Sequence, residues 1–144
     1  MKTRTTPSML IALLLASLTL GVTKAQADSI NLPPVGITFG QTARVTAAND
    51  KIRGTPAVIL YSFYNDDGVV IGQSDSLVVE PGKMMSFDLN ADDIGRETNR
   101  IQIRVVISGD GLRDLSTSME VFENTTGKTT VFIGRNDGRL QQLP

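Results

Sequence analysis

The chain has 144 residues, with 14 basic and 15 acidic side chains and neither cysteine nor histidine. This composition excludes disulfides, thiolate metal sites, the usual zinc ligand sets and catalytic triads that contain histidine. The basic residues are scattered along a nearly neutral chain, which argues against nucleic-acid binding.

The first 27 residues have the features of an export signal. The N-terminus is basic, residues 9–20 are almost wholly apolar, and residues 25–27 read Ala-Gln-Ala, the small-x-small pattern of a signal peptidase site. The apolar stretch is too short to span a bilayer. We therefore predict a signal peptide over 1–27 and a mature chain in the periplasm or outside the cell, with no membrane span. The signal carries three basic residues and no acidic one, which leaves 11 basic and 15 acidic residues, a net charge of −4.

The mature chain contains eight segments that alternate with period 2 or form short apolar runs, as β-strands do. They are 42–47, 57–64, 69–71, 77–79, 85–89, 100–108, 115–122 and 128–133. Before them, residues 31–35 contain two prolines, which predict an edge strand or a lead-in because proline lacks the N–H donor. The polar stretch 90–97 is expected to hold a helical turn, and residues 135–144 have no periodicity and predict a flexible tail.

Turn-forming residues recur about every 8 to 12 positions between these segments. With no helical period longer than a turn, this pattern predicts an all-β fold: an antiparallel two-sheet sandwich of immunoglobulin-like form, with seven or eight strands over residues 28–134. The tryptophan and paired cysteines of true immunoglobulin domains are absent, so that similarity is one of architecture only.

Acidic residues fall in several predicted turns beside glycine or asparagine. Asp66, Asp67, Asp92 and Asp93 are the candidates for a metal site, because calcium binds carboxylate and carbonyl oxygens in such loops. None of the loops matches the twelve-residue calcium loop, and turns use these residue types for backbone reasons alone. If two loops converge at one end of the sandwich, a calcium- or carbohydrate-binding module is the alternative function; no other cofactor is expected.

Five apolar side chains fall on strand faces opposite the predicted core. They are Leu60, Tyr64, Val106, Phe122 and Phe132. If the strands that carry them are neighbours, they form an exposed patch on one sheet, and such patches mark contact sites. The alternative is that both faces of these strands are covered.

The closing hairpin contains short motifs with several interpretations. Gly127-Lys128-Thr129 resembles the end of a phosphate-binding loop, but Phe122 stands where that pattern needs a glycine, so a hairpin turn is favoured. Asn124-Thr125-Thr126-Gly127 is similar over four residues to a loop of the chagasin-type inhibitors of cysteine proteases. In that family the loop comes early in the domain and aromatic residues follow it. Asn124 is also a formal glycosylation acceptor, relevant only in a eukaryotic secretory route.

The segment Ser118–Thr130 resembles the C-terminal pattern of a group of small exported bacterial β-sandwich proteins of unassigned function. Gly40–Arg44 and Pro81–Lys83 fit the same resemblance, which implies the fold and transfers no binding or catalytic residue. No pair of carboxylates is placed as acid/base chemistry requires. We therefore expect a non-enzymatic binding or structural module. It acts through a sheet face or an edge strand on a protein or another envelope component.

Overall fold

The computed structural model describes residues 28–94 and 100–135. The predicted signal peptide and residues 136–144 of the predicted tail lie outside this part of the chain. The described strands are β1 (Asp28–Asn31), β2 (Val35–Ile37), β3 (Gln41–Asn49), β4 (Ala57–Tyr64), β5 (Val70–Gln73), β6 (Leu77–Val79), β7 (Met84–Asn90), β8 (Ile101–Asp110), β9 (Leu115–Glu123) and β10 (Thr129–Arg135). Two short 3-10 turns are η1 (Ala91–Ile94) and η2 (Leu112–Asp114).

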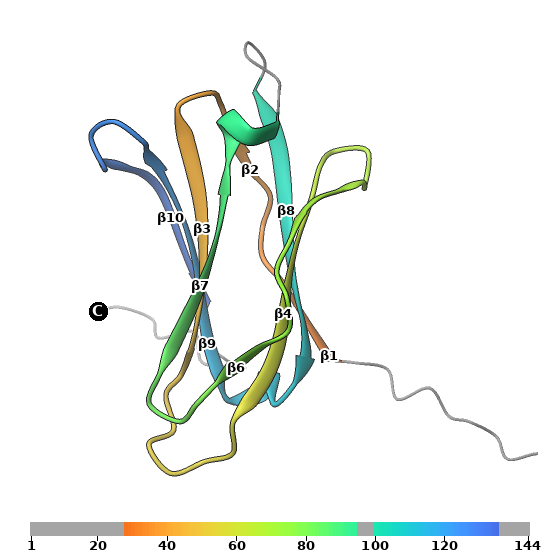
Figure 1. Cartoon of the computed structure of the whole chain (residues 1–144), viewed down its shortest axis with the longest axis vertical. Helices are drawn as coiled ribbons and strands as arrows, with labels where there is room; N and C mark the ends of the chain where they lie inside the picture. The colour runs from red at the N-terminus through yellow and green to blue at the C-terminus, as the bar shows by residue number, and fades with distance from the viewer. Residues whose placement is uncertain (1–27, 95–99, 136–144) are drawn as a thin grey trace, which may run out of the picture.

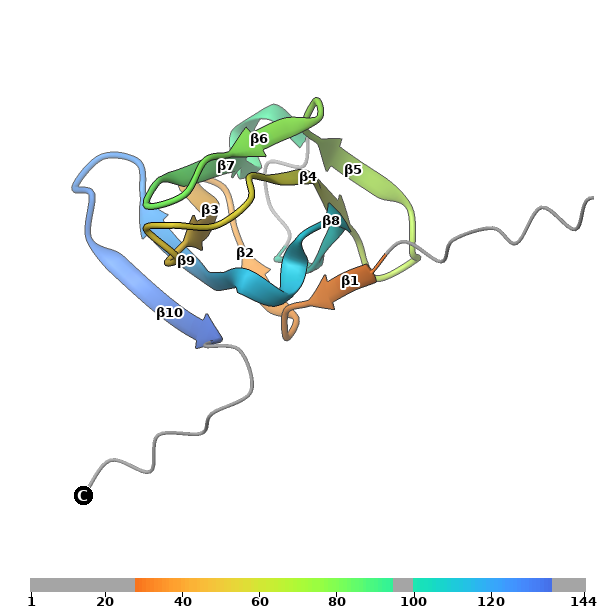
Figure 2. The same ribbon diagram turned by 90° about the horizontal axis from the view of Figure 1, so that it is seen from below.

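The strands form two antiparallel sheets that face each other (Figures 1 and 2). In the first sheet β8 and β4 are central, β1 and β2 pair with β8, and β5 and β6 pair with β4. The second sheet has the order β10-β9-β3-β7. The predicted all-β sandwich without a disulfide is confirmed, while its immunoglobulin-like form stays a prediction.

Ten strands are described where the sequence predicted seven or eight, because the proline segment forms two short strands. β1 and β2 lie along the same edge of β8, on either side of Leu32-Pro33-Pro34. This agrees with the prediction of an edge strand. The helical turn predicted within 90–97 is present as η1, and β10 continues to Arg135, two residues beyond its predicted end.

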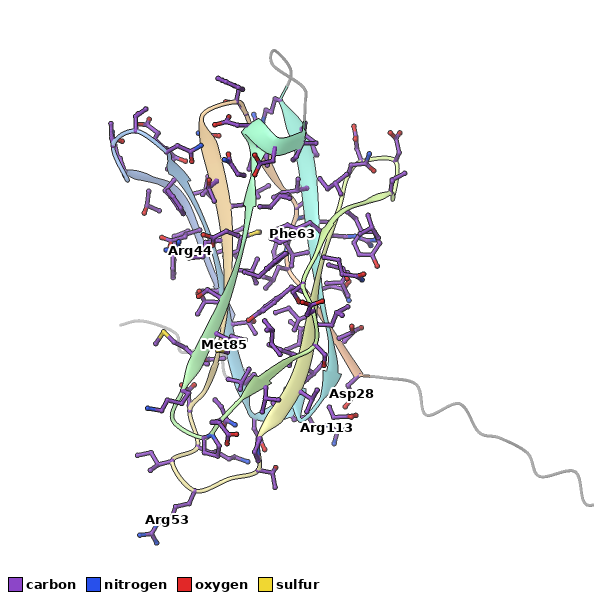
Figure 3. The ribbon with its side chains drawn as sticks, in the orientation of Figure 1. Asp28, Arg44, Arg53, Phe63, Met85 and Arg113 are labelled. Carbon is purple, nitrogen blue, oxygen red and sulfur yellow. The ribbon has the colours of Figure 1, made fainter. Side chains whose placement is uncertain are left out.

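The core lies between the sheets and is built from the apolar faces that the alternation predicted. Every second residue from Ile101 to Ile107 on β8 is buried, as are Ala43, Val45 and Ala47 on β3. Tyr61 and Phe63 of β4 pack against Phe87 of β7, with ring centroids 6.2 Å and 5.9 Å apart respectively. Figure 3 shows Phe63 between the two sheets. These contacts hold the two sheets together.

The two central strands of the first sheet approach closely at Gly109. A Cβ atom on Gly109 would lie 2.0 Å from the carbonyl oxygen of Val58, and its φ of 145° is one that other residues rarely adopt. Glycine is therefore required where β8 ends against β4.

Within the described residues there is no helix with the length and hydropathy needed to cross a bilayer.

Candidate functional site

The two sheets differ in how their edges end. Each edge of the first sheet consists of two short strands, β1 and β2 on one side, β5 and β6 on the other. The break between β1 and β2 contains Pro33 and Pro34, and the break between β5 and β6 spans residues 74–76. Short, interrupted edges protect a sheet from pairing with another strand. The second sheet instead ends in β7 and β10, each a strand of seven residues; β10 has a β-bulge between Thr129 and Val131 and pairs with β9 in regular register from Val131 to Arg135.

β10 is the more exposed of these two edges. Among the described residues it pairs only with β9, and Figure 2 shows it at the rim of the molecule. Val131 and Ile133 lie opposite Val121 and Met119 on the inner face but are only partly buried. Phe132, on the outer face, is 68% exposed. The strand therefore presents three consecutive apolar residues at a free sheet edge.

The hairpin before β10 is positioned by the side chain of Asn124. Its Nδ2 donates to Asn90 Oδ1 and to Asp92 Oδ2, both at 3.0 Å, and its Oδ1 accepts from Thr42 Oγ1 at 2.6 Å. Its backbone N–H donates to Gly40 O at 2.8 Å. Asn124 thus links the β9–β10 hairpin to the start of β3, to the end of β7 and to η1. These contacts give Asn124 a structural role that requires neither a glycan nor an inhibitory loop.

A row of side chains crosses the outer face of the second sheet from β10 to β7. Phe132 lies opposite Glu120, Glu120 opposite Arg44, and Arg44 opposite Asp88. Two hydrogen bonds of 2.8 Å join Arg44 to Asp88, and these bonds raise the pKa of Arg44, with Glu120 adding a smaller electrostatic contribution. Arg44 also lies 5.1 Å from the ring centroid of Phe122.

The five side chains of the predicted patch do not lie together. Leu60, Tyr64 and Val106 belong to β4 and β8 of the first sheet, whereas Phe122 and Phe132 belong to β9 and β10 of the second. Arg104 lies 5.2 Å from the ring centroid of Tyr64 and so covers part of it. Of the five, only Phe132 is largely exposed. The single patch was wrong because alternation assigns a residue to a face but does not say which sheet contains its strand.

A smaller apolar pair that the sequence analysis missed lies on the first sheet. Val58 of β4 and Val78 of β6 are directly opposite each other and are 41% and 50% exposed. The predicted strand 77–79 was too short to show which of its residues face outward. The pair lies beside Leu60 on the same face of β4, at the broken edge.

The acidic loops lie at one end of the sandwich but point to different neighbours. η1 and the β4–β5 turn share that end (Figure 1), yet both carboxylate oxygens of Asp92 accept hydrogen bonds from Gly40 N–H and Asn124. Asp66 and Asp67 instead line a pocket that also includes Gln102 and Arg104. Across the described ranges no three His, Cys, Asp or Glu side chains are grouped as metal ligands. Calcium binding by Asp66, Asp67, Asp92 and Asp93 thus has no assembled site to support it and stays a prediction.

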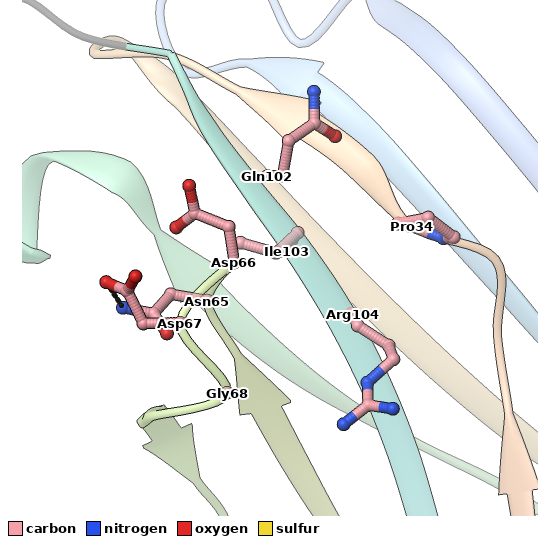
Figure 4. Close-up of a pocket in the computed structure, with 8 residues that line it drawn as sticks. All are labelled: Pro34, Asn65, Asp66, Asp67, Gly68, Gln102, Ile103 and Arg104. Atoms are coloured by element: carbon pink, nitrogen blue, oxygen red, sulfur yellow. Dashed lines mark hydrogen bonds between the residues drawn. The ribbon is translucent and has the colours of Figure 1, made fainter.

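An open pocket of about 400 Å³ lies between the β4–β5 turn and the start of β8 (Figure 4). Asp66, Asp67, Gln102 and Arg104 supply charged and polar groups, and Pro34 forms part of the wall. Asn65 shapes the turn, since its Oδ1 accepts from Val69 N–H at 2.8 Å.

Comparison with known proteins finds no matching family model, no matching curated protein and no matching solved structure.

Proposed function

We propose that this protein is an exported, non-enzymatic binding module that captures an extended segment of a protein partner along β10. The observation that carries the proposal is the apolar edge of β10, which is regular from Val131 onward and contrasts with the interrupted edges of the first sheet. A free edge offers unpaired N–H and C=O groups to an incoming strand. The proposed export is supported by the signal-peptide features of residues 1–27.

The side chains of β10 add selectivity to main-chain pairing. In strand addition, backbone hydrogen bonds supply affinity, and alternating side chains select residues on the two faces of the added strand. Phe132 contacts an added strand on the outer face, and Val131 and Ile133 contact it on the inner face. We therefore expect a partner segment with apolar or β-branched residues on both faces.

The test compares capture of envelope proteins by the wild-type chain and two matched variants. Phe132→Lys places a charge on the proposed edge, which natural edge strands use to prevent pairing. Met84→Lys is the control, because Met84 is 67% exposed on the outer face of the opposite edge strand, β7. We expect Phe132→Lys to lose the captured partner and Met84→Lys to retain it.

Hydrogen exchange on the complex then locates the contact. The backbone N–H groups of β10 that exchange in the free protein become protected when a strand is added. Equal capture by wild type and Phe132→Lys, or protection confined to the first sheet, would contradict the proposal.

The pocket beside Asp66 and Asp67 supports a second candidate, a module that binds a polar ligand such as a carbohydrate. Its mixture of carboxylate, amide and guanidinium groups can donate to and accept from sugar hydroxyls. Soluble glycans are screened by NMR line broadening, with Asp66→Ala and Arg104→Ala as pocket variants. Thermal melting with and without millimolar calcium tests the metal alternative, because a ligand that binds only the folded state raises the melting temperature.

A further inference from the structure

We propose that the strand accepted by β10 is β10 of a second copy, so that the protein forms a closed dimer with one sheet continuous across both chains. This inference rests on the proposed role of β10 as a free edge and specifies its occupant. Antiparallel pairing of a strand with itself about a twofold axis is isologous, so each copy contributes the same surface.

The sequence of β10 is self-complementary in one antiparallel register. With the axis at Phe132, each Phe132 lies opposite its copy, and Val131 lies opposite Ile133 in both directions. Thr130, which lies in the β-bulge, then faces Gly134 at the end of the paired segment, and no residue from Thr130 to Gly134 is charged. Apolar residues meet apolar residues at three successive positions, and a phenylalanine pair directly across the strands adds stabilisation.

The outer face of the second sheet tolerates this pairing electrostatically. Glu120 is the acidic residue in register with Phe132, and in the dimer the two Glu120 strands are separated by three strand spacings, about 14 Å. That exceeds the screening length of about 8 Å at physiological salt. Each Glu120 also lies opposite its own Arg44, so repulsion across the axis is small.

The other edges explain why the assembly closes rather than extends. A filament needs a different edge of the next copy to receive β10. β1 with β2 and β5 with β6 are interrupted, and the remaining edge, β7, carries Asp88 on its outer face where β10 carries Phe132. Pairing β10 with β10 of a second copy is therefore the best match. In that dimer both β10 edges are paired, so no further copy can be added through β10.

The first experiment measures the mass of the full chain by sedimentation between about 1 μM and 1 mM, since a single strand pair is a small interface. We expect a monomer that becomes a dimer as concentration rises. Phe132→Lys is expected to raise the dissociation constant at least about tenfold, because edge lysines oppose strand pairing. Met84→Lys leaves it unchanged, and circular dichroism confirms that both variants are folded.

The second experiment uses the absence of cysteine from the chain. In the proposed register, Phe132→Cys places two thiols directly opposite, at about 4.5–5.5 Å between Cβ atoms, and oxidation cross-links the chains after small adjustments. Thr130→Cys places them about 13 Å apart along the strands, too far for a disulfide. Met84→Cys, on the other edge, provides a second control. We expect rapid cross-linking only at position 132.

Several outcomes would overturn the inference. A wild-type chain that stays monomeric at 1 mM, a dimer insensitive to Phe132→Lys, or equal cross-linking at positions 130 and 132 would each do so. A monomer that dimerises only when residues 136–144 are deleted would show that this segment, and not a second copy, occupies the edge. A monomer whose partner capture is lost in Phe132→Lys would refute the dimer and leave the proposed function standing. If Phe132→Lys changes neither association nor capture, both proposals fail.

Discussion

The two edge strands of the second sheet have the same length but different relations to the core. On β7, Phe87 stacks against Tyr61 at an interplanar angle of 7° and also contacts Phe63, so this edge is bound to the first sheet. On β10, the inward residues Val131 and Ile133 lie opposite Val121 and Met119 of β9. They are partly buried, as Phe87 is, but no aromatic contact joins the described residues of β10 to the first sheet. An edge strand thus contributes to stability when the opposite sheet covers it, and is available for contact when it does not.

The hairpins that lead into these strands differ in the same way. Before β7, the buried side chain of Asn49 donates to Thr55 O and Val79 O, and the backbone of Asn49 pairs with Gly82 and Lys83. Before β10, the exposed side chain of Asn124 makes the corresponding bridges. We expect the β7 side to unfold with the core and the β10 side to open locally at lower free energy.

The largest expected effect is on the aromatic contact of β7. Phe87→Ala removes a ring packed against two others, and we expect it to lower the free energy of unfolding by about 3 kcal/mol. Phe132→Ala on β10 is the matched change and should cost within about 0.5 kcal/mol, because its ring is largely exposed. Urea denaturation at low micromolar concentration, where association does not contribute, measures both. Equal losses would remove the distinction between the edges.

The second prediction compares the two asparagines. Asn49→Ala leaves the carbonyl groups of Thr55 and Val79 without their side-chain donor, so we expect a loss of about 2 kcal/mol or more. Asn124→Ala removes two exposed hydrogen bonds that water replaces and one part-buried bond from Thr42, and should cost about 1 kcal/mol. Hydrogen exchange should show faster local opening of the β9–β10 hairpin in Asn124→Ala. A larger loss from Asn124→Ala than from Asn49→Ala would contradict this account.

The sequence predicted the strands and their buried faces because alternation reports which side of a strand is apolar. Val45 and Ile103 were assigned to the core on that signal alone, and both are fully buried. Alternation does not report which strands are neighbours, because pairing brings together residues far apart in the chain. For that reason Leu60 and Phe132 were grouped although they lie on different sheets.

The candidate site was only partly predictable for the same reason. Phe132 was identified as an apolar residue on an outer face, but nothing local in the chain shows that β10 is an edge. That property follows from the order of the second sheet, in which β10 pairs with β9 alone among the described strands. Asn124 was noted only as part of a short motif, since its partners Thr42, Asn90 and Asp92 are 82, 34 and 32 positions away.

The third prediction uses the hydroxyl that joins β4 to β7. Tyr61 Oη donates to Met85 O at 2.7 Å, and burial raises the pKa of Tyr61 to about 12. Tyr61→Phe keeps the ring and loses this bond, so we expect a loss of about 1 kcal/mol at pH 7.

The pH dependence of the Tyr61 variant sharpens this test. The folded state holds the Tyr61 proton more tightly than the unfolded chain, whose tyrosine pKa is about 10. The stabilisation is therefore complete below pH 10 and is lost as the pH rises toward 12. The difference between wild type and Tyr61→Phe should shrink over that window in urea denaturation. A difference that stays constant up to pH 11.5 would show that Tyr61 has no raised pKa.

The smallest expected effect concerns the outer face, where the edges differ in charge. The side chains of Arg44 and Asp88 are 42% and 43% exposed, so water screens their attraction, and Asp88→Asn should cost about 0.5 kcal/mol. Because the pair is electrostatic, adding 0.5 M NaCl should reduce the difference between wild type and Asp88→Asn. Glu120→Gln, on β9, should cost less, since Glu120 makes only a minor contribution to the raised pKa of Arg44. If Glu120→Gln costs more than Asp88→Asn, the main stabilising partner of Arg44 is Glu120 on β9 rather than Asp88 on β7. The charge pair would then lie on the β10 side of the outer face, contrary to this account.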